Sequence, residues 1–228
     1  MTPPVVVSIA ATDSSGGAGL TADLCTFAAL GVHGAGVVTA VTAQDTTAVH
    51  AVHPVPLDIV MAQLDAVLTD LRPSVVKVGM IGSAEAVVCL SQRLADVSGT
   101  RVQIVVDPVL RASTGASFTD DTVVAAYREH LLPVATVITP NEEELRVLGC
   151  EDHAGLVVTR GGDVVTTNDH GTGCTYASAL AAYLALGRSH AAAITAAHGF
   201  VARQLEIGRT WDIGRGRGPV AHTTKEIA

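Results

Sequence analysis

The sequence has few aromatic residues and no long run of apolar ones. Phe, Trp and Tyr make up 3% of the 228 residues, although 48% of the residues are hydrophobic. This composition favours closely packed parallel strands and helices over a sandwich with an aromatic core. No segment approaches the roughly 20 apolar residues of a membrane span, and the N-terminal residues do not form a signal peptide. We therefore expect a cytoplasmic protein without a membrane partner.

Positive charge and cysteine are also scarce. The 14 Lys and Arg residues are outnumbered by 22 Asp and Glu residues, which gives a formal net charge of −8. This balance excludes the basic footprint of a general nucleic-acid binder. The four cysteines (Cys25, Cys89, Cys150 and Cys174) have no metal-type spacing such as C-x-x-C. We predict that they are free thiols in a reducing compartment.

The length and the order of segments predict one α/β domain over residues 1–228. Strands are expected at 5–10, 34–45, 74–82, 102–110, 154–162 and at the start of 134–145, which continues past a proline into an acidic helix. Helices are expected from Leu20 onward, at 56–71, at 83–97, at about 174–186 and at 189–207. Because the strands are mostly apolar and alternate with helices, we predict a mainly parallel sheet covered on both faces.

Sheets of this kind bind ligands beyond the carboxyl ends of their strands. The candidate residues at those ends are Asp13, Gln44, Met80, Asp107, Asn141 and Arg160. The glycine-rich segment after the first strand includes a G-x-G-x-x-A match at 17–22, which has three interpretations: a dinucleotide site, a tight turn, or a loop where a ligand approaches the backbone. No G-x-x-x-x-G-K-[ST] segment is present, which excludes a P-loop.

The segment HGTGCT, residues 170–175, joins a glycine-rich turn to a predicted helix. Amides of Gly171, Thr172 and Gly173, together with the N-terminal dipole of that helix, can form an anion hole for a phosphoryl group. We predict that the pKa of the Cys174 thiol falls in this setting, so that it can accept a proton from a substrate hydroxyl. The alternative is a small buried cysteine that only fills space.

Carboxylates follow two of the other predicted strands. Asp107 ends an apolar strand and precedes a proline, where it can face a metal or a phosphate group. Asn141 and Glu144 lie three residues apart at the start of a helix, so both can face the water shell of a Mg²⁺ ion. The alternative for this second pair is a helix cap, with Asn141 as the capping residue.

A resemblance to a known family covers nearly the whole chain. The ordered segments IAATDSSGGAGLTADLCTFAALGVHG, TAVTAQDT, VKVGMIGS, VVDPVL, VITPNEEE and HGTGCT closely resemble the hydroxymethylpyrimidine/phosphomethylpyrimidine kinases of thiamin biosynthesis. That family belongs to the ribokinase-like superfamily, so the resemblance implies a three-layer α/β/α sandwich. It also implies ATP- and Mg²⁺-dependent phosphorylation of 4-amino-5-hydroxymethyl-2-methylpyrimidine and of its monophosphate, by a homodimer.

The roles of the family's site residues can be assigned to residues of this chain where the motifs match. The resemblance implies that the pyrimidine contacts Ala11, Asp23, Gln44, Met80 and Val109. It implies that ATP contacts Thr139, Asn141, Arg160 and Gly162, and that Asp107 and Glu144 support the metal. Gly171, Thr172, Gly173 and Cys174 are then the anion hole and the base. The glycine-rich first loop, on this basis, faces the pyrimidine rather than a dinucleotide.

The chain departs from the family pattern at several positions. Ala11 replaces a glycine, Ser113 and Arg160 each replace a lysine, and Asp163 replaces a histidine. Residues 149–172 are also short, because the family has an additional helix and hairpin there. Either this lineage has lost both elements or the 228 residues omit part of the protein. The missing elements help to enclose ATP in the family.

Two other functions stay open from the sequence. One is a pyridoxal-type kinase with the same chemistry, because the cysteine at position 174 is shared by the pyrimidine and pyridoxal kinases. The other is a pyrimidine-binding protein whose ATP site has eroded, which the short 149–172 segment favours and the intact HGTGCT segment opposes.

Overall fold

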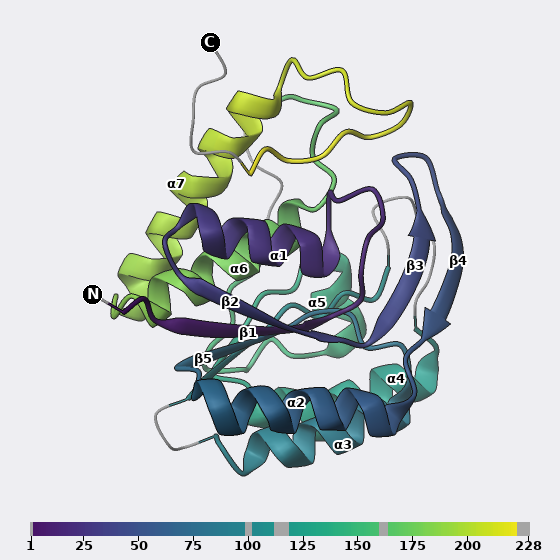
Figure 1. Cartoon of the computed structure of the whole chain (residues 1–228), viewed down its shortest axis with the longest axis vertical. Coiled ribbons are helices and arrows are strands. Elements are labelled where there is room, and N and C mark those ends of the chain that lie inside the picture. The colour runs from purple at the N-terminus through teal and green to yellow at the C-terminus, as the bar shows by residue number, and fades with distance from the viewer. Residues whose placement is uncertain (1, 99–101, 112–118, 160–163, 223–228) are drawn as a thin grey trace.

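The computed structural model of the chain describes residues 2–98, 102–111, 119–159 and 164–222. Its centre is a parallel sheet of five strands in the order β2-β1-β5-β6-β7 (Figure 1). The strands are β1 (Val5–Ala10), β2 (His33–Val38), β5 (Val75–Val78), β6 (Gln103–Val106) and β7 (Val137–Ile138). The predicted parallel sheet is confirmed.

Helices cover both faces of this sheet, which makes the predicted three layers (Figure 1). The helices on one face are α1 (Gly19–Ala29), α6 (Thr172–Ala185) and α7 (His190–Gly208). On the other side lie α2 (Leu57–Leu71), α3 (Ala84–Ala95) and α4 (Asp121–Ala126), the last continued by η1 (Tyr127–Leu131) and η2 (Leu132–Val134). A short helix, α5 (Glu142–Leu148), follows β7.

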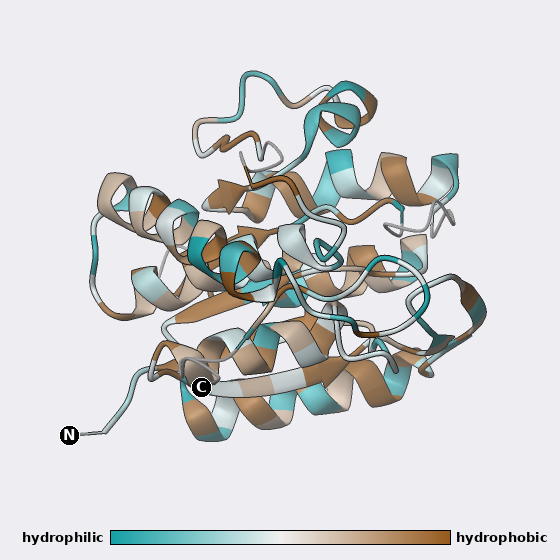
Figure 2. Cartoon of the chain, turned by 90° about the horizontal axis from the view of Figure 1, so that it is seen from above, coloured by the Kyte–Doolittle hydropathy of each residue, from teal (hydrophilic) through white to brown (hydrophobic). Residues whose placement is uncertain are grey.

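Alternating strand residues supply two separate apolar cores. Val7 and Ile9 of β1 face the α2–α3 layer, whereas Val6 faces α6 and α7. Figure 2 shows apolar strands enclosed by helices that carry both hydrophobic and hydrophilic residues. Because successive side chains of a strand point to opposite faces, Ser8 and Lys77 lie on the α6 side, where buried polar groups need partners.

The segment predicted as one strand over 34–45 is divided in two. β2 ends at Val38, and β3 (Ala40–Gln44) leaves the sheet to pair in antiparallel fashion with β4 (Val49–Pro54). The break lies at Thr39, whose hydroxyl donates to the Met80 carbonyl at 2.8 Å while its amide donates to Ala10. The exposed, histidine-containing β4 lacks the apolar pattern by which a strand is predicted.

The strand predicted over 154–162 is not formed in the residues that the structure describes. Leu156 makes only an isolated parallel bridge to Ile138 of β7, and residues 160–163 lie outside the described ranges. The other expected elements are present, but β5 and β6 are much shorter than the strands predicted over 74–82 and 102–110, and α6 begins at Thr172 rather than at 174. Across the described part of the chain, no helix combines the length and apolar character that crossing a bilayer demands.

Two helix ends allow a direct test of how tightly the loops above the sheet are packed. Gly171 and Gly187 both have positive φ angles, of 85° and 82°. A Cβ atom at Gly171 would lie 1.9 Å from the Gly17 carbonyl oxygen, whereas one at Gly187 would meet nothing within 4 Å.

We predict that Gly187→Ala lowers the free energy of unfolding by about 1–2 kcal/mol, the cost of the left-handed conformation alone. Gly171→Ala should cost about 1–3 kcal/mol more, because the Gly17 loop must also move. Urea denaturation of both variants measures the difference. Equal losses would show that the two loops are not in close contact.

Candidate active site

A cavity of about 850 Å³ opens beyond the carboxyl ends of the central strands, where ligands of open α/β sheets bind. Its size is that of a site for a small molecule. Most of the residues predicted to bind ligands line it: Ala11, Gln44, Met80, Asp107, Val109, Asn141, Glu144, Gly171, Thr172, Gly173 and Cys174. Arg160 and Gly162 lie outside the described residues.

The wall near the β3–β4 hairpin is largely apolar. Ala11, Ala40 and Met80 form a small buried cluster with Val109 packed against it. Gln44 is 9% exposed and ends β3 at the edge of this cluster. Ser14 fixes the Gln44 backbone, since its hydroxyl donates to the carbonyl at 2.6 Å and accepts from the amide at 2.7 Å. The wall can therefore hold a flat ring with one polar edge.

Helix α6 brings the HGTGCT segment to the cavity. Gly171, in the left-handed conformation, is the N-cap residue. The first N–H groups of a helix have no partner within the helix, and exposed Gly173 offers its N–H to the cavity. Thr172 differs from the prediction, because both its amide and its hydroxyl donate to the Asp169 carbonyl, at 3.2 and 2.6 Å. An anion bound here would therefore depend on the other amides of this turn.

Cys174 has the opposite electrostatic behaviour to the one predicted. Burial, aided by the Asp107 and Asp23 carboxylates, raises the pKa of its thiol to about 12, although Lys77 and a hydrogen bond from the Gly19 backbone act in the other direction. The helix dipole does not overcome these effects, so the expected fall in pKa was wrong and Cys174 is a neutral thiol at neutral pH.

Asp23 does not contact the cavity, and its predicted role toward the pyrimidine must be corrected. It is fully buried and accepts hydrogen bonds from Ser8 at 2.5 Å, from Ser178 at 2.6 Å and from Lys77 at 3.0 and 3.1 Å. Helix α1 directs the Asp23 side chain to the sheet and away from the loops that line the cavity. Asp23 therefore acts on the site through Lys77.

Lys77 is a cavity residue that the sequence reasoning missed. Its ammonium group is fully buried, 3.0 Å from Asp23 and 3.7 Å from Asp107. Burial alone would lower the pKa of Lys77, but Asp23, and to a lesser degree Cys174 and Asp107, hold it above its usual value. The available signal was a lysine within the otherwise apolar strand VVKV.

Asp107 and Glu144 have the features of carboxylates that bind a cation. Asp107 Oδ2 is buried without a hydrogen-bond partner among the described residues, and burial raises the pKa of its carboxyl group despite Lys77. Burial and the neighbouring Asp107 raise the pKa of Glu144 to about 7. Within the described ranges no three His, Cys, Asp or Glu side chains form a metal cluster. One or two carboxylates plus substrate phosphates are the usual set for Mg²⁺, so these residues fit that ion.

The helix-cap alternative for Asn141 and Glu144 is also realised. Asn141 accepts from the Glu143 and Glu144 amides at 3.0 and 2.9 Å, and Glu144 accepts from the Asn141 amide at 2.9 Å, which is a capping box. Thr139, the remaining predicted ATP contact, is 1% exposed and its hydroxyl donates to the Val106 carbonyl. Thr139 directly follows β7 and does not line the cavity, so its predicted contact with ATP stays a prediction.

A buried pair, Asp13 and His170, lies next to Gln44 and also lines the cavity. The Nε2 atom of His170 lies 2.7 Å from Asp13 Oδ2 and 3.3 Å from the side-chain amide of Gln44. Burial opposes ionisation of Asp13, but hydrogen bonds from His170 and Ser15 hold its pKa below the usual value. The position of Asp13 beyond the first strand predicts that it meets a ligand, but no local pattern pairs it with His170, which is 157 residues away.

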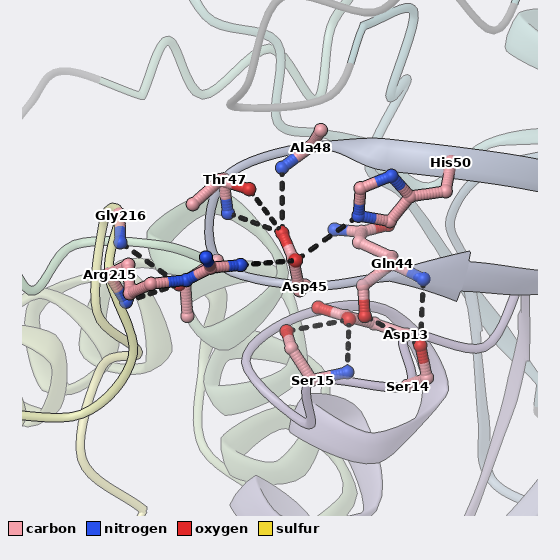
Figure 3. A network of polar contacts seen from close by, with 11 residues as sticks. Asp13, Ser14, Ser15, Gln44, Asp45, Thr47, Ala48, His50, Arg215 and Gly216 are labelled. Atoms are coloured by element: carbon pink, nitrogen blue, oxygen red, sulfur yellow. Dashed lines mark hydrogen bonds and ion pairs between the residues drawn. The ribbon is translucent and has the colours of Figure 1, made fainter.

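The segment 209–220, which we call the strap, contacts both His170 and the hairpin. Figure 3 shows Arg215 and Gly216 of the strap beside the β3–β4 turn. Thr46, in the β3–β4 turn, accepts from the amides of Arg215 and Gly216 at 3.1 and 3.0 Å. Further along the strap, the side chain of Arg217 binds Asp169, directly before His170. The hairpin and the loop before α6 are therefore joined by a third segment.

Comparison with known proteins shows which family the chain is similar to. The sequence model of the family described as phosphomethylpyrimidine kinase matches residues 13–156 and 149–221. The hydroxymethylpyrimidine/phosphomethylpyrimidine kinase of Rhizobium meliloti is 38% identical, over 96% of each chain. That of Synechococcus elongatus is 37% identical, over 97% of this chain and 98% of its own. The Rhizobium alignment extends over 259 positions, more than the 228 residues of this chain.

Solved structures share the fold. The pyridoxal kinase of Staphylococcus aureus in complex with pyridoxal superposes with a TM-score of 0.85, at 29% identity over 97% of this chain and 94% of its own. The phosphomethylpyrimidine kinase of Clostridium difficile 630 has a TM-score of 0.77, at 31% identity over 88% and 98%. The chain is therefore a phosphotransferase with the ribokinase-like fold, and it belongs to the phosphomethylpyrimidine kinase family.

Proposed function

We propose that the protein phosphorylates 4-amino-5-hydroxymethyl-2-methylpyrimidine and its monophosphate at the expense of ATP, in thiamine biosynthesis. The observation that carries this proposal is one cavity lined both by the apolar wall with Gln44 and by the α6 N-terminus with Cys174. The ring and the transferring phosphate each have a matching surface there. The names of the relatives in the preceding comparisons support the choice of substrate.

The apolar wall would bind the pyrimidine. Met80, Val109 and Ala11 would contact the faces of the ring, and Gln44 would pair with its polar edge. The hydroxymethyl group would then point to the turn that contains Gly171 and Gly173, whose amides favour negative charge on the transferring phosphoryl group. Thr172 would contribute by holding this turn closed.

Cys174 would accept the proton that leaves the substrate hydroxyl as its oxygen attacks the terminal phosphate. Its thiolate is a minor species at neutral pH, because the pKa of the thiol is about 12. Lys77 is the nearby charge that favours the thiolate. General-base catalysis by the thiolate therefore requires turnover to rise with pH.

Asp107 and Glu144 would hold Mg²⁺, with Asn141 and the turn that follows β7 beside the ATP phosphates. When bound, the ion neutralises charge on the phosphates. This chain would supply the two carboxylates. Their pKa values are raised because both groups are buried and the nearby positive charge does not offset the burial. Arg160 and Gly162 stay proposed ATP contacts on the strength of the sequence resemblance alone.

The assembly and location of the protein belong to the same proposal. We infer a single catalytic domain, shortened over 149–172 relative to its relatives, in a cytoplasmic homodimer. The division of the family match at 149–156, together with alignments longer than the chain, supports the shortening. The family resemblance supports the dimer.

Pyridoxal is the second candidate substrate. The TM-score of 0.85 with a pyridoxal kinase is the observation that favours it. An ADP-release assay with hydroxymethylpyrimidine, its monophosphate and pyridoxal decides between the two kinases. Binding of the pyrimidine without ADP release from any of the three would instead indicate an eroded ATP site.

The role of Gln44 can be tested by binding. We predict that Gln44→Ala weakens pyrimidine binding by about 1–3 kcal/mol, because polar groups at the buried edge lose their partner. Val41→Ala, at an exposed position of the same hairpin, should leave the affinity unchanged. Titration calorimetry measures both. An unchanged dissociation constant for Gln44→Ala would reject the contact.

The raised pKa of Glu144 makes a prediction for stability. Its folded-state pKa of about 7 exceeds the usual 4.5, so ionisation of Glu144 opposes folding, and its destabilising effect grows as pH rises from about 4.5 through 7. Glu144→Gln, which stays neutral, should gain stability relative to wild type as the pH rises, by less than about 1 kcal/mol at pH 5 and by about 3 kcal/mol at pH 8. Thermal unfolding of both proteins measures this, with Glu143→Gln, an exposed neighbour, as the control. A difference that does not change with pH would contradict the assignment.

Cys174 is tested by kinetics. If it only fills space, Cys174→Ser should leave turnover nearly normal. As a general base it contributes roughly 10²–10⁴-fold, so we predict that the serine variant loses about 10²-fold or more in kcat while pyrimidine affinity changes much less. Cys174→Asp should retain more activity than Cys174→Ser, because a carboxylate can also accept the proton. Wild-type turnover in the serine variant would exclude the thiol as the base.

A further inference from the structure

Asp169 is a carboxylate at the edge of the cavity to which the proposed chemistry gives no role. It lines the cavity together with Gly171, Thr172 and Gly173. Its backbone carbonyl accepts from the amide and the hydroxyl of Thr172 at 3.2 and 2.6 Å, so Asp169 is part of the turn at which α6 begins. A negative charge therefore lies beside the amides that are proposed to favour the transferring phosphoryl group.

Arg217 of the strap holds both oxygens of that carboxylate. Its Nε atom donates to Asp169 Oδ1 at 2.7 Å, and its Nη2 atom donates to Oδ2. This two-point contact fixes the plane of the carboxylate and offsets its charge. The side chain of Asp169 is 26% exposed and that of Arg217 is 56% exposed, and ion pairs of this kind add little to stability. The consequence of the pair for the cavity is the orientation and the charge of Asp169.

The backbone on both sides of Arg217 is held in place. The Arg217 amide donates to the Thr46 carbonyl in the β3–β4 turn at 3.1 Å. The carbonyl of the next residue, Gly218, accepts from the His170 amide at 3.0 Å. Because these bonds lie immediately before and after the arginine side chain, the strap presents the guanidinium to Asp169 from a fixed position.

Without Arg217, the Asp169 carboxylate would act against a bound phosphate in two ways. Its charge would repel the phosphate, because Coulombic repulsion is stronger at a partly desolvated site than in water. Its oxygens would also compete for the turn, since the unpaired N–H groups at a helix N-terminus attract nearby anions. Both effects depend on the charge of Asp169, so an amide in place of the carboxylate should abolish them.

The two proposed pyrimidine substrates bring different charges to this turn. The hydroxymethyl group of the first substrate is uncharged, whereas the same group in the monophosphate carries nearly two negative charges. ATP is common to both reactions. A change of charge at Asp169 should therefore affect the monophosphate more than the hydroxymethyl compound.

We propose that the Asp169–Arg217 pair determines how well the site accepts the phosphorylated pyrimidine, because it keeps the carboxylate beside the α6 turn neutralised and bound to the strap. This inference rests on the proposed function, since it takes the pyrimidine and its monophosphate as substrates. Both residues are positioning residues in this scheme, because they act through the charge and the arrangement of the turn.

The test measures kcat/KM for the monophosphate and for the hydroxymethyl compound at one saturating concentration of MgATP, and takes the ratio of the first to the second. Arg217→Ala leaves a free carboxylate and should lower this ratio about 5-fold or more. Asp169→Asn leaves a free guanidinium and should raise the ratio. The double variant Asp169→Asn/Arg217→Ala has neither charge and should return the ratio to within about 2-fold of wild type.

Arg209→Ala is the matched control. Arg209 is another exposed arginine of the strap, but it pairs with Glu206 at 3.1 Å, so its loss changes the net charge equally and should leave the ratio unchanged. Added salt should reduce the effect of Arg217→Ala, because exposed charges are screened, whereas a structural defect would persist. A wild-type ratio in Arg217→Ala, or a double variant with a ratio as low as that of Arg217→Ala, would overturn the proposal.

Failure of the proposed function would appear differently. Wild-type protein that releases no ADP with either pyrimidine would contradict the kinase assignment, and calorimetric affinities of the same variants for the two compounds would then give the ratio. Should Arg217→Ala fail to fold, Asp169→Asn decides alone, because it keeps the backbone carbonyl that binds Thr172. A ratio in Asp169→Asn that does not rise above wild type would then overturn the proposal.

Discussion

The buried carboxylate of Asp23 is the interaction on which the geometry of the cavity depends. It joins four elements, since it lies on α1 and accepts hydrogen bonds from Ser8 on β1, Lys77 on β5 and Ser178 on α6. A buried ion pair adds little net stability, but losing one partner leaves an uncompensated charge and costs about 3–5 kcal/mol. The four elements must therefore keep the relative positions in which these side chains meet. Because α6 begins with the turn that is proposed to bind phosphate, the same contacts also hold that turn above β5 and β6.

A second constraint acts above the sheet, where three loops from distant parts of the chain meet. Gly171 has no space for a side chain because the Gly17 carbonyl lies against it, and Gly17 has none because His170 and Pro219 lie against it. The strap is also bound to these loops, because the side-chain amide of Asn168 donates to the carbonyls of Gly208 and Trp211 at 2.8 and 2.9 Å. The walls that would meet the ring and the phosphate are consequently parts of one connected unit rather than independent loops.

Sequence reasoning succeeded where the signal is local. Apolar strands and capped helices predicted the parallel sheet, and glycines before a helix predicted the turn at Gly171, because both depend on neighbours in the chain. It failed where the chemistry depends on pairs far apart. Asp23 was assigned to the ligand because nothing in the sequence shows that Lys77, 54 residues away, neutralises it in the core. β4 was missed because its partner β3, and not an apolar pattern, makes it a strand.

The predicted fall in the pKa of the Cys174 thiol is wrong for a related reason, which also describes the electrostatics of the site. A helix N-terminus lowers a thiol pKa only by a limited amount, whereas burial and two nearby carboxylates act in the opposite direction. Asp107, Glu144 and Cys174 all have raised pKa values because negative charge is concentrated in a poorly solvated space. Positive charge brought beside Asp107 and Glu144 would relieve all three together, by the same Coulombic attraction. The fraction of Cys174 present as thiolate is thus coupled to the charge of whatever occupies the carboxylates, so the form proposed to accept the proton is most populated when the rest of the site is filled.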